Sequence, residues 1–103
     1  MASRSKTKDV EDTLSYLLGA ITNAQRGGNE HVVAFEYARK VVTASEKPLQ
    51  KLGLYERTLR VLDESEEFLK ARRFEEADDT VLALAREMME KSGRFSKWRK
   101  VKT

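Results

Sequence analysis

The C-terminal residues 91–103 combine several cationic side chains with two large aromatic ones and contain no acidic residue. The aromatic residues are Phe95 and Trp98, and Trp98 is the only tryptophan in the chain. Lysine and arginine neutralise phosphates and release counterions, whereas aromatic rings stack on exposed bases for roughly 1–3 kcal/mol per base. The segment therefore predicts binding to a nucleic-acid backbone. Base-specific reading is not expected, because no recognition helix or finger is visible.

Charge is unevenly distributed along the chain. The net charge is +3, residues 1–8 carry +3 and residues 91–103 carry +6, so residues 9–90 must carry −6. Basic arms on an acidic body are typical of proteins that bind polyanions. The predicted nucleic-acid-binding residues are Arg94, Lys97, Arg99, Lys100, Lys102, Arg4, Lys6 and Lys8. Charged termini also serve solubility alone, which is the simplest competing interpretation.

Phe95 and Trp98 allow two other interpretations. Their spacing of three residues would place both rings on one side of a short helix, as anchors for a partner protein with an apolar groove and an acidic rim. Alternatively, both rings fold back and cap the protein's own core, since an exposed tryptophan is uncommon. Such docking would leave the basic side chains outside, so it does not exclude polyanion binding.

Enzymatic and metal chemistry find little support in the sequence. His31 is the only histidine, no cysteine is present, and no glycine-rich phosphate-binding motif occurs. Acidic residues gather between positions 64 and 79, namely Glu64, Glu66, Glu67, Glu75, Glu76, Asp78 and Asp79. This cluster could hold Mg²⁺ or Ca²⁺, but a solvated face paired with Lys70, Arg72 and Arg73 is the simpler interpretation. We therefore expect neither catalysis, cofactor nor metal.

Composition favours one small helical domain. The chain has 103 residues, 40% hydrophobic and 36% charged, with one proline and five glycines. No apolar run suits a signal peptide or a membrane span, so we expect a cytoplasmic protein without membrane contact. Scarce asparagine and glutamine, no cysteine and many charges favour a thermophilic source.

Hydrophobic spacing predicts four helices. The first spans residues 9–25, with Asp9 as its N-cap, and the second spans residues 30–45 after Asn29. The second is apolar on most sides, which predicts a central position in the fold. The third begins at Pro48 and runs to about Arg72, with fraying or a kink expected at Gly53. A fourth follows from Phe74 to Ser92, after a tight turn.

Residues Phe68, Phe74, Ala77 and Val81 have the order and spacing of large and small positions in a tetratricopeptide-repeat hairpin. The third and fourth predicted helices therefore resemble one such hairpin locally. Glu64 stands where that family prefers leucine, Arg72 stands where it prefers glycine, and residues 9–45 show no second copy. The resemblance implies hairpin packing and assigns no peptide-binding residues.

The sequence thus predicts an all-α antiparallel four-helix bundle or two packed helical hairpins, with basic N- and C-terminal tails. Its expected divisions are an arm at 1–8, a helical domain at 9–93 and a basic aromatic tail at 94–103. The predicted function is that of a non-enzymatic accessory subunit in a DNA- or RNA-handling complex, in contact with a larger protein. The alternative is a helical protein-interaction module, with homodimerisation as one form, that makes no nucleic-acid contact.

Overall fold

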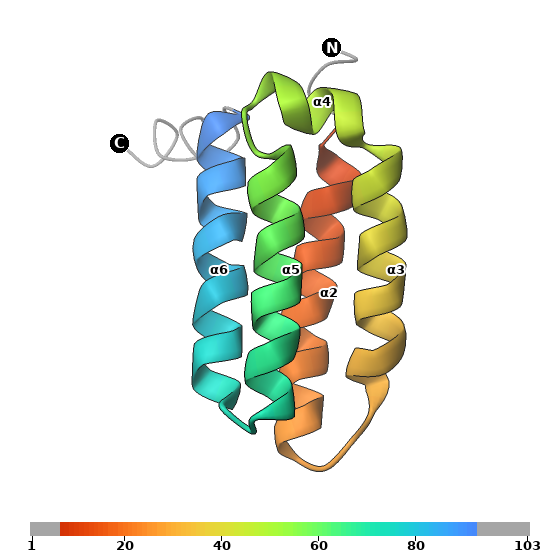
Figure 1. Cartoon of the computed structure of the whole chain (residues 1–103), viewed down its shortest axis with the longest axis vertical. Helices are drawn as coiled ribbons and strands as arrows, with labels where there is room; N and C mark the ends of the chain where they lie inside the picture. Colours follow the sequence, from red (N-terminus) through yellow and green to blue (C-terminus); the bar gives the residue numbers. More distant parts are fainter. Residues whose placement is uncertain (1–6, 93–103) are drawn as a thin grey trace, which may run out of the picture.

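The computed structural model describes residues 7–92, and these residues form five helices. The helices are α2 (Lys8–Gln25), α3 (Glu30–Ala44), α4 (Glu46–Lys51), α5 (Tyr55–Lys70) and α6 (Phe74–Lys91). The four long helices run alternately up and down, and the short α4 crosses one end between α3 and α5 (Figure 1). The all-α bundle predicted from hydrophobic spacing is therefore confirmed, and none of its helices within residues 7–92 is long and apolar enough to span a membrane.

Each long helix contributes an apolar stripe to one core. α2 packs against α3 and α6, and α5 packs against α6 and α3. Full burial of a leucine, valine or phenylalanine side chain contributes about 1.5–3 kcal/mol, so this core is the main source of stability. The core includes Val10, Leu14, Leu17, Ile21, Ala34, Phe35, Ala38, Val42, Leu49, Leu54, Leu62, Ala77, Val81, Leu84 and Met88.

The predicted single helix from Pro48 to Arg72 is wrong, because the chain turns at Gly53. Gly53 has a φ of 72°, in the left-handed region that glycine enters without steric cost. Its N–H donates to the Gln50 carbonyl at 3.0 Å, and the Leu54 N–H donates to the Leu49 carbonyl at 2.9 Å. This pair of bonds is a Schellman motif, which ends α4 and allows α5 to start in a new direction.

The same motif ends α2 and α5. At the end of α2, Gly27 has a φ of 95° and its N–H donates to the Ala24 carbonyl. At the end of α5, the equivalent position is Arg72, with a φ of 62°. Its N–H donates to the Leu69 carbonyl at 2.9 Å, so an arginine occupies a backbone position that favours glycine. The predicted tight turn at Arg72 is thus present, with strained geometry.

Two further details differ from the sequence-based expectations. α2 begins at Lys8, one residue before the predicted start, and its N-cap is Thr7 and not the predicted Asp9. α3 is not enclosed on all sides, because Val32, Val33 and Tyr37 project into solvent. The apolar surplus that predicted a central helix is instead an exposed apolar surface.

Candidate interaction face between α2 and α3

The predicted nucleic-acid-binding residues lie mostly beyond the part of the chain that the structure describes. Lys8 is the exception: it opens α2, and its exposed Nζ lies 3.0 Å from Oδ2 of Asp12. The remaining predicted residues fall outside residues 7–92, namely Arg4, Lys6, Arg94, Phe95, Lys97, Trp98, Arg99, Lys100 and Lys102. Their proposed roles therefore rest on the sequence.

Within residues 7–92, large apolar side chains are strongly exposed on only two helices. Tyr16 of α2 is 47% exposed, and on α3 the exposed fractions are 54% for Tyr37, 58% for Val32 and 61% for Val33. Val33, Tyr37 and Val41 follow one another at spacings of four, so they share one side of α3. This side of α3 borders α2, which makes an apolar strip along their junction.

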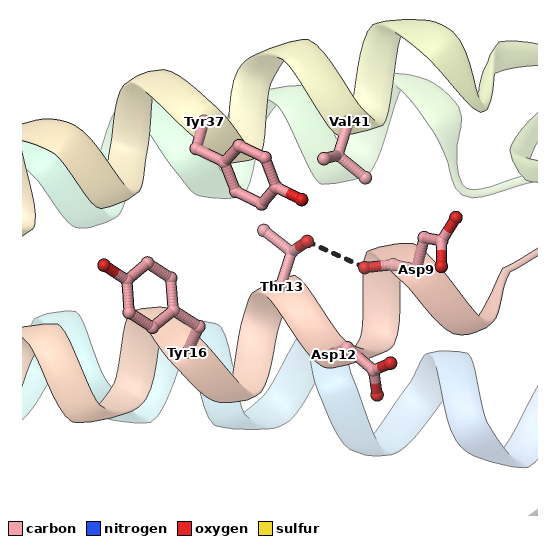
Figure 2. Close-up of a pocket in the computed structure, with 6 residues that line it drawn as sticks. All are labelled: Asp9, Asp12, Thr13, Tyr16, Tyr37 and Val41. Carbon is pink, nitrogen blue, oxygen red and sulfur yellow. Dashed lines mark hydrogen bonds between the residues drawn. The ribbon is translucent and has the colours of Figure 1, made fainter.

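Part of this strip forms a shallow pocket of about 240 Å³. It is lined by Asp9, Asp12, Thr13 and Tyr16 from α2, and by Tyr37 and Val41 from α3. Figure 2 shows the two tyrosine rings entering the gap from opposite helices, with α6 behind α2 and α5 behind α3. We call this surface, with the neighbouring Val33, the α2–α3 face.

The polar groups of the α2–α3 face divide into two kinds. The Thr13 hydroxyl donates a 2.7 Å hydrogen bond to the Asp9 backbone carbonyl within its own helix (Figure 2). Asp9 and Asp12 are both exposed. The Asp12 carboxylate points away from the gap (Figure 2) and contacts Lys8, so the carboxylate at the rim is that of Asp9. The pocket therefore offers aromatic walls and a negatively charged rim near the start of α2.

The opposite side of α3 is held by an ion-pair network. One guanidinium nitrogen of Arg39, Nη2, lies 3.0 Å from Oδ1 of Asp63 and 2.6 Å from Oε1 of Glu66, both on α5. Partial burial alone would lower the pKa of Arg39. The hydrogen bonds from Arg39 to the two carboxylates, together with their negative charges, outweigh this effect and raise that pKa. Arg39 thus remains charged and links α3 to α5.

Other candidates for chemistry are weaker. His31 lies in the first turn of α3, and its Nδ1 is buried without a hydrogen-bond partner. Among residues 7–92, no group of three or more histidine, aspartate or glutamate side chains is arranged to hold a metal ion. In the predicted acidic cluster, Glu66 instead pairs with Arg39, Glu67 with Lys70, and Glu76 with Arg73.

The α2–α3 face was not predicted from the sequence. The signal was present, because α3 has more apolar residues than one buried stripe requires. Comparisons with protein-family models, with curated proteins and with solved structures give no match to this chain. A function for this chain is therefore inferred from its own residues.

Proposed function

We propose that this chain is a small, non-enzymatic accessory subunit that binds the backbone of a nucleic acid through its two basic ends. The binding is electrostatic and tolerant of sequence, with Phe95 and Trp98 available for stacking on unpaired bases. The subunit belongs to a complex in which a larger protein performs the chemistry.

The observation that carries this proposal is the position of the two helix ends. α2 begins at Lys8 and α6 ends at Lys91, and both points lie at the same end of the bundle (Figure 1). The two helices pack directly on each other, because four alternating helices return the chain to the end where it started. Residues 1–8 and 91–103, with charges of +3 and +6, therefore leave the bundle close together.

This arrangement favours polyanion binding at one end of the molecule. Residues 9–90 carry −6 and would repel phosphates, so a nucleic acid is directed toward the end where the arms leave. If the two arms left from opposite ends, each would contact a strand with its own charges alone. Two arms from the same end can contact one strand together, which raises affinity through the higher effective concentration.

The test is binding of the full chain to labelled single-stranded DNA and RNA over a series of salt concentrations. If about six phosphates are neutralised, affinity for a single strand falls roughly 300-fold between about 50 and 200 mM salt. The triple variant Lys97→Gln, Arg99→Gln, Lys100→Gln should bind more weakly and show a shallower salt dependence. No binding at the lowest salt concentration would disprove the proposal.

The turn between α5 and α6 provides a matched control at the opposite end of the bundle (Figure 1). Lys70, Arg72 and Arg73 are exposed there, so changing all three to glutamine removes the same charge from a different place. Lys70 and Arg73 already contact Glu67 and Glu76. The control variant should keep most of the affinity. Equal losses in both triple variants would mean that net charge matters and the arms do not.

A second candidate function is protein binding through the α2–α3 face. The exposed Tyr16 and Tyr37, beside the carboxylates of Asp9 and Asp12, favour a partner segment with an aromatic anchor flanked by cations. A synthetic peptide with one tryptophan between lysines should bind the chain, and the same peptide with glutamates in place of lysines should not. Equal binding of the peptide to a Tyr16→Ser, Tyr37→Ser variant would exclude this face.

A further inference from the structure

The pocket of the α2–α3 face is sized for one side chain. Its volume of about 240 Å³ is below the roughly 300–1,000 Å³ of most small-molecule sites. It is open to solvent along the junction of two helices, and its walls are the rings of Tyr16 and Tyr37 (Figure 2). A single aromatic side chain from a peptide segment matches this shape better than a free metabolite.

The chemistry of the pocket selects an aromatic group with cations beside it. Tyrosine rings are attracted to another ring in offset or edge-to-face contact, beyond the effect of the area buried. Their faces also attract lysine and arginine. The exposed carboxylate of Asp9 at the rim adds attraction for positive charge, whereas Asp12 already contacts Lys8. A basic segment with a tryptophan satisfies all three preferences.

The chain contains one such segment, and it starts within reach of the pocket. Trp98 lies between Lys97 and Arg99, six residues after Ser92, so an extended backbone carries it roughly 20 Å beyond the end of α6. α6 packs on α2, and α2 packs on α3. Since neighbouring helix axes lie about 8–10 Å apart, the junction of α2 and α3 is roughly 15 Å from the axis of α6.

The direction of the helices also brings the segment to the correct part of the face. α6 ends at the end of the bundle where α2 begins (Figure 1). The α2 residues that line the pocket, Asp9 to Tyr16, lie in the first half of that helix. The segment therefore passes around the start of α2 and then along the face toward Tyr16, which lies eight residues, or about 12 Å, after Lys8. A nearly extended backbone is needed to cover both distances.

Gly19 supplies a separate observation on the same helix. It lies in the interior of α2, three residues after Tyr16, and its exposed position has no atom within 4 Å of where a Cβ would be. Glycine at an exposed interior position of a helix is destabilising relative to alanine. Nothing within residues 7–92 requires that cost, whereas a segment lying closely on α2 would.

We infer that residues 94–99 dock on the α2–α3 face of the same molecule, with Trp98 between Tyr16 and Tyr37 and its flanking cations near Asp9 and Asp12. The docked segment covers the exposed apolar strip. It also leaves Lys100 and Lys102 beyond the pocket. This inference does not rest on nucleic-acid binding, because docking is measured without any nucleic acid. The two do compete for the same side chains, since Trp98, Lys97 and Arg99 of a docked segment are not free to contact a strand.

Fluorescence of Trp98 in the full chain tests the inference, because no other tryptophan contributes. The reference for a fully solvated ring is a synthetic peptide of residues 91–103. We expect the emission of the full chain to be shifted to the blue of the peptide and to be quenched less by acrylamide. In the Tyr16→Ser, Tyr37→Ser variant the ratio of docked to undocked chains should fall about tenfold, and emission should approach that of the peptide.

Val32→Ser is the matched control, because Val32 is also an exposed apolar residue of α3 but does not line the pocket. It should leave the fluorescence unchanged, and circular dichroism should show equal helix content in all variants. Asp9→Asn with Asp12→Asn should weaken docking and reduce its salt dependence.

Three results would overturn the inference. The first is that acrylamide quenches Trp98 in the wild-type chain as strongly as in the peptide, which would mean that no docking occurs. The second is that Trp98 stays protected from acrylamide in the double tyrosine variant, which would place the ring elsewhere. The third is that this protection rises with protein concentration while light scattering gives a dimer mass, which would make a second copy the occupant.

Discussion

The two hairpins of the bundle bury their inner sides alike but differ on their outer sides. On α5 and α6 the exposed positions are mainly charged, and no large apolar side chain among the described residues of these helices is strongly exposed. On α2 and α3 the exposed positions include two tyrosines and two valines. The outer side of the α5–α6 hairpin is thus polar, whereas the outer side of the α2–α3 hairpin includes exposed apolar side chains.

The charged side of the α5–α6 hairpin is also internally satisfied. Arg57 of α5 lies 3.2 Å from Glu87 of α6, and Arg73 contacts Glu76 at the turn. Ser65 of α5 donates a buried 3.2 Å hydrogen bond to the Ala77 carbonyl of α6. The Arg57–Glu87 and Ser65–Ala77 contacts join α5 to α6, although exposed ion pairs contribute little to stability. One hairpin thus pairs several of its charges internally, whereas the other has exposed apolar side chains without a neighbour among residues 7–92 that covers them.

Two aromatic residues of α3 measure this contrast within one helix. Phe35 is fully buried and Tyr37, two residues later, is 54% exposed. We expect Phe35→Ala to reduce the free energy of unfolding by about 3–5 kcal/mol, because it leaves a core cavity. Tyr37→Ala should cost about 0.5 kcal/mol or less, as surface substitutions usually do. Urea unfolding followed by circular dichroism measures both.

A loss of several kcal/mol for Tyr37→Ala would contradict the exposed position of its ring. It would mean that the α2–α3 face supports the fold and is not free for a peptide segment. A loss below 1 kcal/mol for Phe35→Ala would instead place the core elsewhere.

The Arg39 network is the next test, because it joins the two hairpins. Arg39→Met keeps an unbranched side chain but removes the contacts with Asp63 and Glu66. Since Arg39 is partly exposed, the expected loss is about 1 kcal/mol, and it should shrink in high salt. Arg86→Met is the control, because Arg86 is exposed on α6 and forms no ion pair within residues 7–92. Equal losses would show that side-chain length, and not the ion pairs, stabilises the fold.

The turns of the two hairpins differ at one equivalent residue. Gly27 ends α2 and Arg72 ends α5, both with positive φ. Arg72→Gly should raise the free energy of unfolding by about 1 kcal/mol, because it relieves left-handed backbone strain. Gly27→Ala should lower it by a similar amount, although nothing fills the space around its Cβ position. Thermal unfolding of both variants checks the opposite signs.

A loss of stability in Arg72→Gly would show that contact of the Arg72 guanidinium with the Phe74 ring outweighs the strain.

The helices were predictable because their signals are local. Apolar residues at spacings of three and four place Val10, Leu14, Leu17 and Ile21 in the core of α2, as expected. The turn at Arg72 was also predictable, since charged residues replace the apolar pattern there. Gly53 was harder to interpret, because a glycine inside an apolar pattern fits a kinked helix as well as a Schellman turn. The outcome depends on where Leu49 and Leu54 find core partners.

The α2–α3 face could not be predicted in the same way. An apolar surplus on α3 indicates burial, but the sequence does not say which side a neighbouring helix covers. Tyr16 and Tyr37 meet only because α2 and α3 are antiparallel in this register, which is a tertiary property. The opposite holds for the basic and aromatic residues of 93–103. Their chemistry is plain in the sequence, and their proposed docking and nucleic-acid contacts stay predictions.

The smallest expected effect comes from Gly19, and it bears most directly on what covers the face. Gly19→Ala should raise the free energy of unfolding by about 0.5 kcal/mol if α2 is uncovered at that point, since alanine favours helix and meets no atom of residues 7–92. Ala83→Gly at an exposed interior position of α6 should lower stability by about as much, as expected for an uncovered surface.

If residues 94–99 lie closely over Gly19, the added methyl group weakens their docking. The stability gain then shrinks, and acrylamide quenching of Trp98 increases in the same variant. A full gain with unchanged quenching would place the docked segment on the tyrosine side of the face only, away from Gly19.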